Sequence, residues 1–422
     1  MQNQIRSIRF VALFTCLLVT ASVAADWPQW RGPDRLGTVE GADWPDALND
    51  QTLKQLWRVE LAEGYPGPIV SGGRVFTVET LDAKAEVVRA FDAKTGEQLW
   101  EKSWPGSMKV PFFARRNGSW IKATPATDGE NLYVMGMIDE LVCLNAATGD
   151  EVWRVDFKER FGTREPQFGQ ACSPLVDGDA VYVQAGLSVC KLDKKTGKTI
   201  WRAMHDQRDF IGGNFSSPVI ETVAGKRQLL VQTRGELAGL DLESGDVLWR
   251  ESVKAFRGMN ILPPTKVDEN HVFTSSYGGG SFFFNVTAAE DGTLAAKLVW
   301  NNAIEGYMSS PMVFEGHLYL HGRDKTVRCL ELKTGKPAWE TTEKYGEYWS
   351  SVRNGDRLLT LGDNGMLRLI HATPDETLKI LSEHKISDQE TWGHLAIVGD
   401  MLYIRELKGL VAYRWSGPVG VD

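Results

Sequence analysis

The 422-residue chain has 55 acidic residues against 47 basic ones, which gives a formal net charge of −8 at pH 7. Binding to nucleic acid requires a basic face, so this balance argues against a general nucleic-acid-binding protein. The length would accommodate two or three ordinary domains, but the unbroken repeat described below favours one closed ring.

Residues 1–25 have the features of a secretory signal peptide. Arg6 and Arg9 provide a positive start, Phe10–Val19 an apolar run, and Ser22–Ala25 a small-residue cleavage site. The run is shorter than the ~20 apolar residues of a spanning helix, and no later segment is long and apolar enough to span a membrane. We therefore expect the mature chain to be periplasmic or secreted and to have no transmembrane helix.

A short phrase that ends in tryptophan recurs through the chain. Clear copies are FDAKTGEQLW, LNAATGDEVW, LDKKTGKTIW, LDLESGDVLW and LELKTGKPAW. The repeat tryptophans are Trp57, Trp100, Trp153, Trp201, Trp249, Trp300 and Trp339. A period of ~40–50 residues built from strand-like units is typical of a β-propeller. We expect these tryptophans to pack against the neighbouring blade.

A second repeat precedes the first: a small residue, proline, an apolar pair, a turn and an apolar-aromatic strand. Five clear and three looser copies predict an all-β, eight-bladed propeller of four-stranded antiparallel blades. The last blade lacks an outer strand, whereas Leu53–Leu61 is an outer strand with no blade before it. Pairing the two would close the ring. The expected organisation is an N-terminal extension at 26–52, the propeller at 53–415 and a tail at 416–422.

These two phrases resemble the repeats of the pyrroloquinoline-quinone-type (PQQ-like) β-propeller family over nearly the whole mature chain. That family includes quinone-dependent alcohol dehydrogenases and non-enzymatic exported members, such as the propeller subunit of the outer-membrane β-barrel assembly machinery. The opening DWPQWRGPDRLG (Asp26–Gly37) is similar to that of exported members of unknown role. Fold alone does not choose among these functions.

The longest predicted connections all fall on one face, around the mouth of the central funnel, and long loops in a compact ring tend to be functional. Their aromatic and basic residues are our binding candidates. These candidates are Arg115, Arg116, Trp120, Arg164, Phe168, Asn214, Phe215, Arg257, Tyr307, Trp349, Trp392 and His394.

The resemblance to the quinone-dependent dehydrogenases implies adjacent cysteines against the cofactor and a calcium held by Glu and Asn, with a catalytic Asp nearby. No two cysteines of this chain are adjacent, and no spacing of Cys or His indicates a metal site. We therefore expect no cofactor, no metal and no catalytic residue.

The favoured function is that of a non-catalytic binding or scaffold module for a protein or cell-envelope polymer, monomeric outside a complex. The alternatives are an oxidoreductase that uses pyrroloquinoline quinone with calcium, or another ligand, in the funnel, and a small-molecule sensor without turnover.

Overall fold

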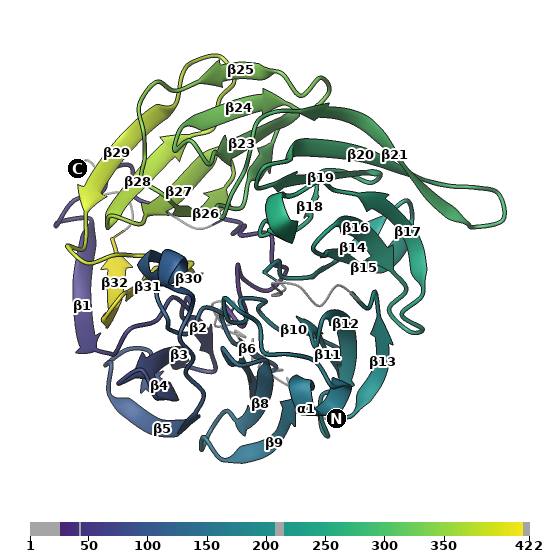
Figure 1. Ribbon diagram of the computed structural model, residues 1–422. Helices are drawn as coiled ribbons and strands as arrows, with labels where there is room; N and C mark the ends of the chain where they lie inside the picture. The colour runs from purple at the N-terminus through teal and green to yellow at the C-terminus, as the bar shows by residue number, and fades with distance from the viewer. Residues whose placement is uncertain (1–25, 42–43, 207–214, 417–422) are drawn as a thin grey trace, which may run out of the picture.

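In the computed structural model, residues 26–41, 44–206 and 215–416 are described, and they form a ring of eight four-stranded antiparallel sheets (Figure 1). Blade one contains β2 (Ile69–Ser71), β3 (Arg74–Leu81), β4 (Ala85–Asp92) and β5 (Gln98–Pro105). Blade two contains β6 (Ala126–Thr127), β7 (Asn131–Met135), β8 (Glu140–Asn145) and β9 (Glu151–Asp156). Blade three contains β10 (Leu175–Asp177), β11 (Ala180–Ala185), β12 (Ser188–Asp193) and β13 (Thr199–Ala203). Blade four contains β14 (Val219–Val223), β15 (Lys226–Gln232), β16 (Glu236–Leu240) and β17 (Val247–Ser252).

Blades five to eight repeat this order, with the first strand of each blade beside the axis. Blade five contains β18 (Thr265–Lys266), β19 (His271–Ser276), β20 (Gly280–Ala288) and β21 (Leu294–Asn302). Blade six contains β22 (Met312–Phe314), β23 (His317–His321), β24 (Val327–Glu331) and β25 (Pro337–Glu340). Blade seven contains β26 (Trp349–Asn354), β27 (Arg357–Gly362), β28 (Met366–His371) and β29 (Lys379–Lys385). Blade eight contains β30 (Ala396–Val398), β31 (Met401–Glu406), β32 (Gly409–Trp415) and, from the other end of the chain, β1 (Leu53–Glu60).

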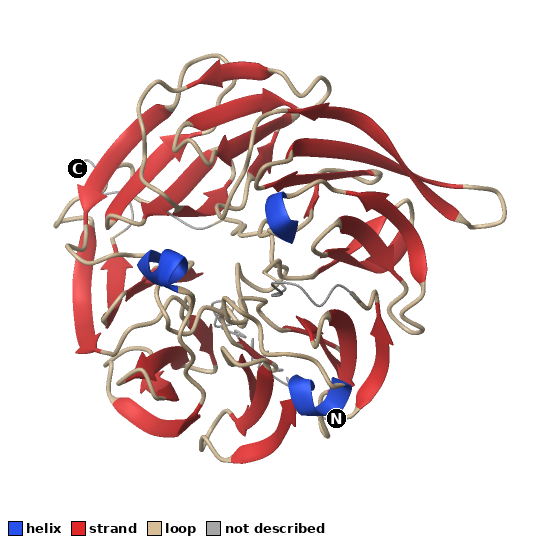
Figure 2. Ribbon diagram, in the orientation of Figure 1, coloured by secondary structure: helices blue, strands red, loops and turns tan. Residues whose placement is uncertain are grey.

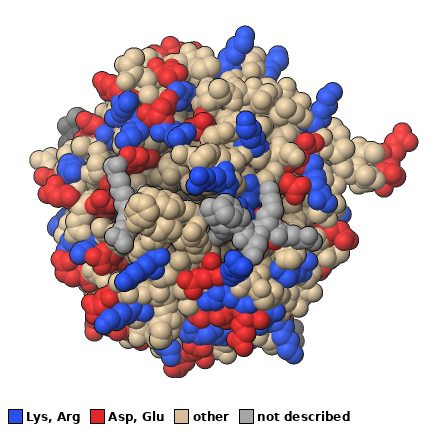
Figure 3. Space-filling view, in the orientation of Figure 1, with Lys and Arg blue, Asp and Glu red and all other residues tan. Residues whose placement is uncertain are grey.

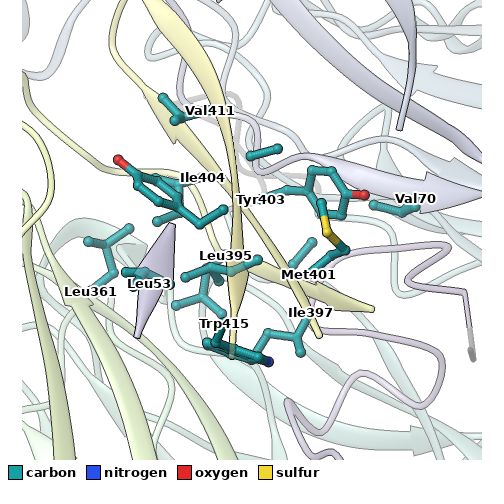
Figure 4. Close-up of a cluster of buried hydrophobic side chains, with 14 of the residues drawn as sticks. Leu53, Val70, Leu361, Leu395, Ile397, Met401, Tyr403, Ile404, Val411 and Trp415 are labelled. Carbon is teal, nitrogen blue, oxygen red and sulfur yellow. The ribbon is translucent and has the colours of Figure 1, made fainter. Parts of the chain in front are cut away.

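The N-terminal outer strand closes the ring, as predicted. β1 pairs antiparallel with β32, from Leu53 opposite Trp415 to Glu60 opposite Gly409. Leu53 and Trp415 join the buried cluster between blades seven, eight and one, together with Leu361 and Tyr403 (Figure 4). The first and last strands of the propeller thus occupy each other's otherwise unpaired edges.

The recurring tryptophan phrase is the contact between consecutive blades. The Nε1 of Trp153 donates to the carbonyl of Lys194 in the next blade at 2.9 Å. A Cβ placed on Gly197 of that turn would lie 2.7 Å from the Trp153 ring, and Gly197 also has a φ of +67°. Glycine is therefore required in the Thr-Gly turn both by its backbone conformation and by the indole against it.

The junction between blades seven and eight departs from this contact because β29 has no tryptophan, and blade five departs from it as well. Its last two strands form a long hairpin, β20–β21, which projects from the ring in Figure 1 and takes the place of the Thr-Gly turn. The preceding tryptophan, Trp249, instead donates to Gln228 Oε1 of its own blade at 2.6 Å. Figure 3 shows acidic side chains at the tip of this projection.

The segment before β1 closes one end of the central channel rather than lying outside the propeller. Trp27 exchanges two backbone hydrogen bonds with Val70 of blade one. The amide of Val39 donates to the carbonyl of Arg353 of blade seven at 2.8 Å. Arg35 donates to carbonyls of blades three and four. The segment, purple in Figure 1, thus crosses the middle of the ring.

In the described part of the chain, three short helices lie in the connections between blades (Figure 2). They are η1 (Phe112–Asn117), α1 (Phe157–Phe161) and η2 (Phe256–Gly258). Asp156 caps α1 by accepting from the amides of Lys158 and Glu159. In the orientation of Figure 2, η1 and η2 lie near the centre of the ring, where the longest connections gather.

Candidate functional site: an aromatic cavity at the centre of the ring

A cavity of about 490 Å³ lies on the axis, on the face where the innermost strands begin. Thr124, Ser173 and Ser217, each directly before the proline that leads into an innermost strand, line it. Trp30 of the N-terminal segment also lines it, and that segment binds the far ends of the same strands, at Val70 and Thr127. The N-terminal segment therefore forms the floor of the cavity.

The hydroxyls at the strand starts link one blade to the next. The amide of Gly67 donates to Thr124 Oγ1 at 3.0 Å, that of Thr124 to Ser173 Oγ at 3.0 Å, and that of Ser173 to Ser217 Oγ at 2.9 Å. These hydroxyls are acceptors in a structural chain around the axis.

Aromatic side chains make up much of the cavity wall. They are Trp30, Tyr65, Phe113, Phe168, Phe215, Phe256, Tyr277, Tyr307, Tyr348 and Trp392. We call these ten residues the aromatic belt. Trp392 stacks on Tyr348 at a centroid distance of 5.7 Å, and Phe168 contacts Phe113 and Phe215 at 6.0 and 6.2 Å. Such ring contacts stabilise one another beyond their buried area.

The rim of the cavity exposes apolar surface to solvent. Phe112 is 79% exposed, Phe113 60% and Phe256 50%. Phe112 and Phe113 begin η1, and Phe256 begins η2. Figure 3 shows uncharged residues gathered near the centre of this face. Exposed phenylalanines grouped around a cavity make this face a candidate binding surface.

Two basic residues of the cavity lining, Lys122 and His394, have strongly lowered pKa values. Burial lowers the pKa of Lys122 to about 8, and its ammonium group contacts the carbonyls of Gly118 at 3.4 Å and Trp120 at 3.2 Å. Burial also lowers the pKa of His394 to about 3, so its ring is neutral at physiological pH. The His394 ring stacks on Trp27 at 6.4 Å, which joins it to the floor of the cavity.

The structure brings six of the candidate residues together and places the others elsewhere. Phe168, Phe215, Arg257, Tyr307, Trp392 and His394 line the cavity. Trp120 lies behind the wall, with its ring edge-on to Tyr65 at 5.4 Å. Arg164 is exposed beyond the cavity lining. Arg115 and Arg116 lie in η1, but their side chains, and the whole of Asn214, are outside the described residues.

Trp349 was expected on the funnel face, and this expectation is wrong. It is 3% exposed and packs between His321 and Tyr345, at 5.0 and 6.2 Å. Its neighbour Tyr348 lines the cavity instead. Tyr348 directly precedes β26 and Trp349 is its first residue. Successive side chains of a strand point to opposite sides, so an error of one residue in the expected position exchanges a cavity-lining side chain for a core side chain.

Sequence reasoning missed two residues of the cavity lining, Trp30 and Lys122, for different reasons. Trp30 belongs to the extension, which has no repeat to place it. Lys122 lies in a predicted loop, but a lone lysine carries no signal of burial. The two tryptophans of Asp26–Gly37, Trp27 and Trp30, were the available clue, because tryptophan is highly buried on average.

The cavity does not fit pyrroloquinoline quinone with calcium. Its lining, as far as the structure describes it, includes no carboxylate, and the described cysteines, all four buried and free, lie outside it. In the described part of the chain, no three His, Cys, Asp or Glu side chains are grouped to hold a metal ion. Calcium would need six to eight oxygen ligands, roughly.

We expect, accordingly, that mixing the purified protein with calcium and pyrroloquinoline quinone produces no stoichiometric quinone spectrum and no dye-linked oxidation of alcohols. Spectrophotometry after gel filtration measures the first and a dye-reduction assay the second. Turnover above a heat-inactivated control would contradict this expectation.

The fold and site define a PQQ-like, eight-bladed propeller with an aromatic central cavity. The family model described as outer membrane protein assembly factor BamB matches residues 46–119 and 84–341, and the chain belongs to that family. BamB of Moranella endobia is 23% identical over 340 residues, covering 76% of this chain and 80% of that protein. BamB of Yersinia pestis is 20% identical over 384 residues, covering 87% and 90%.

Solved structures support the fold in the same way. The crystal structure of BamB from Moraxella catarrhalis superposes with a TM-score of 0.60 at 15% identity, covering 86% of this chain and 98% of that one. The quinohemoprotein alcohol dehydrogenase of Comamonas testosteroni gives 0.63 at 14% identity, covering 94% and 81%. Both an outer membrane protein assembly factor and an alcohol dehydrogenase therefore share this fold. Within the described residues, no helix is long and apolar enough to cross a membrane.

Proposed function

We propose that this chain is an exported, non-catalytic assembly factor of the cell envelope that binds a protein partner on the aromatic face of its propeller. The observation that carries the proposal is the group of exposed phenylalanines around the cavity, Phe112, Phe113 and Phe256. Membership of the BamB family supports a role in outer-membrane protein assembly, and the N-terminal residues 1–25 support export.

The charges beside these phenylalanines indicate the chemistry of the partner. Arg257 is exposed next to Phe256, with its guanidinium 5.2 Å from the Phe256 ring centre. Lys122 lines the cavity below, and the described residues of the lining include no Asp or Glu. An acidic segment with apolar side chains is therefore complementary to this face in both charge and polarity. Aromatic and arginine residues commonly dominate the energies of such interfaces.

Replacement of Phe112, Phe113 and Phe256 together by serine is expected to weaken partner capture from solubilised envelopes by about tenfold or more. The thermal midpoint should stay nearly unchanged, because these rings are exposed and bury little apolar surface in the free protein. Pull-down with quantitative mass spectrometry measures capture, and circular dichroism measures the melting temperature.

A matched control replaces Leu99, Ile200 and Val299 by serine. These residues are 46%, 51% and 47% exposed, but they lie on the outer strands β5, β13 and β21, away from the cavity lining. Capture should survive in this variant. Equal loss in both variants would show that general apolar surface, and not the aromatic face, holds the partner.

A further inference from the structure

Among the residues that the structure describes, the cavity lining contains the cations Lys122 and Arg257 and no acidic residue, in a protein whose net charge is negative. Lys122 contacts two backbone carbonyls and the sulfur of Met137, at 3.7 Å, and no carboxylate. In the described part of the chain Lys122 makes no ion pair. A partly buried ammonium group held by carbonyls alone is incompletely stabilised, because its partial removal from water costs more than two neutral acceptors return.

Two further cations, Arg31 and Arg35, lie beside Trp30 in the N-terminal segment that forms the floor of the cavity. The guanidinium groups of Arg31 and Arg35 lie 5.5 and 5.8 Å from the centre of the Trp30 ring. Arg35 donates to the carbonyls of Pro218 at 2.6 Å and Ser173 at 3.1 Å, and Arg31 donates to the carbonyl of Leu36 at 2.7 Å. These acceptors are neutral, and the carboxylate that acts most strongly on Arg31 is that of Asp34, which is exposed. The floor therefore adds to the positive potential of the cavity.

The volume and the aromatic lining of the cavity indicate the size and the shape of the ligand. A volume of about 490 Å³ lies in the range of small-molecule sites, roughly 300–1,000 Å³. Flat aromatic walls stack on flat ligands, and Trp30 and Trp392 present such rings to the cavity. The wall thus suits an aromatic body and the lysine suits an anionic group attached to it.

We infer that the cavity is a binding site for a small organic anion with an aromatic body, whose carboxylate or equivalent acidic group pairs with Lys122. The ligand stacks within the aromatic belt and needs no metal ion. This site does not rest on the proposed function, because a free ligand would occupy it whether or not a protein partner binds the rim.

Isothermal titration of the purified protein with three naphthalene derivatives tests the inference. Naphthoate carries the anion, naphthylmethanol has the same body without charge, and naphthylmethylamine carries a cation. At neutral pH we expect naphthoate to bind with a Kd below roughly 1 mM and about tenfold more tightly than the alcohol, with the amine weakest. Saturable binding that does not distinguish the three, or no saturable binding of naphthoate, would overturn the inference.

Variants of Lys122 test whether this lysine causes the preference for naphthoate. K122M keeps the length and apolar stem of the side chain and should abolish the preference for naphthoate over the alcohol, whereas K122R should retain it. K109M removes an exposed lysine of the same connection and should bind like the unmodified protein. Retention of the full preference in K122M would contradict the assignment. If K122M does not fold, the three-ligand comparison on the unmodified protein and on K122R decides.

Discussion

Deletion of residues 26–61 is expected to abolish the cooperative folding of the ring, whereas deletion of residues 26–52 is expected to weaken it. The longer deletion removes β1, and with it the partner of β32 and the core residues Leu53 and Trp57, which are 3% and 9% exposed. It also leaves β32 as an open sheet edge, which favours aggregation. Circular dichroism melting and gel filtration of proteins that begin at residues 26, 53 and 62 would measure the difference.

The protein that begins at residue 53 is the internal control for this prediction. It lacks the floor of the channel but retains the closing strand, so it should remain a monomeric β-sheet protein with a lower melting temperature. If the protein that begins at residue 62 melted like the one that begins at residue 26, strand exchange between the two ends would not be what closes the ring.

Substitution of Arg35 by methionine is expected to reduce the free energy of unfolding by about 3 kcal/mol, since buried acceptors would lose their donor at about 1–3 kcal/mol each. Arg35 is 1% exposed, and it joins the N-terminal segment to Pro174 and Pro218 of blades three and four. Methionine fills a similar volume but donates no hydrogen bond. Urea unfolding followed by tryptophan fluorescence measures the change.

Arg353→Met is the matched control for Arg35→Met. Arg353 donates to the carbonyl of Gly355 at 3.0 Å in an exposed position, so its loss should change stability by less than roughly 0.5 kcal/mol. Equal effects of the two substitutions would mean that the buried Arg35 guanidinium does not hold the N-terminal segment in place.

The repeat made the ring predictable, because each blade repeats the same packing problem. The Thr-Gly-x-x-x-Trp phrase encodes a contact between a glycine in one blade and an indole in the preceding one, so its recurrence predicts both the blades and their order. Blade eight was predictable from the strand count at its two ends. The segment Asp26–Gly37 was not, because its partners, such as Val70, Pro218 and Arg353, are scattered through the chain and follow no period.

The candidate site was predictable as a face but not as a cavity. Loop position identified Phe168, Phe215 and Trp392, since connections of equal topology meet on one side of a propeller. The choice between Tyr348 and Trp349 depended on strand register, which one residue changes. The burial of Lys122 depended on the conformation of a long connection, and no local pattern encodes it.

Site-specific photo-crosslinking in intact envelopes tests the binding face most directly. A photoreactive phenylalanine analogue at Phe113 or Phe256 should give crosslinks to a discrete partner, which mass spectrometry then identifies. The same analogue at Asp179, an exposed residue of the turn between β10 and β11 at the opposite end of blade three, should give none. Crosslinks from Asp179 with none from the two rim positions would contradict a partner-binding aromatic face.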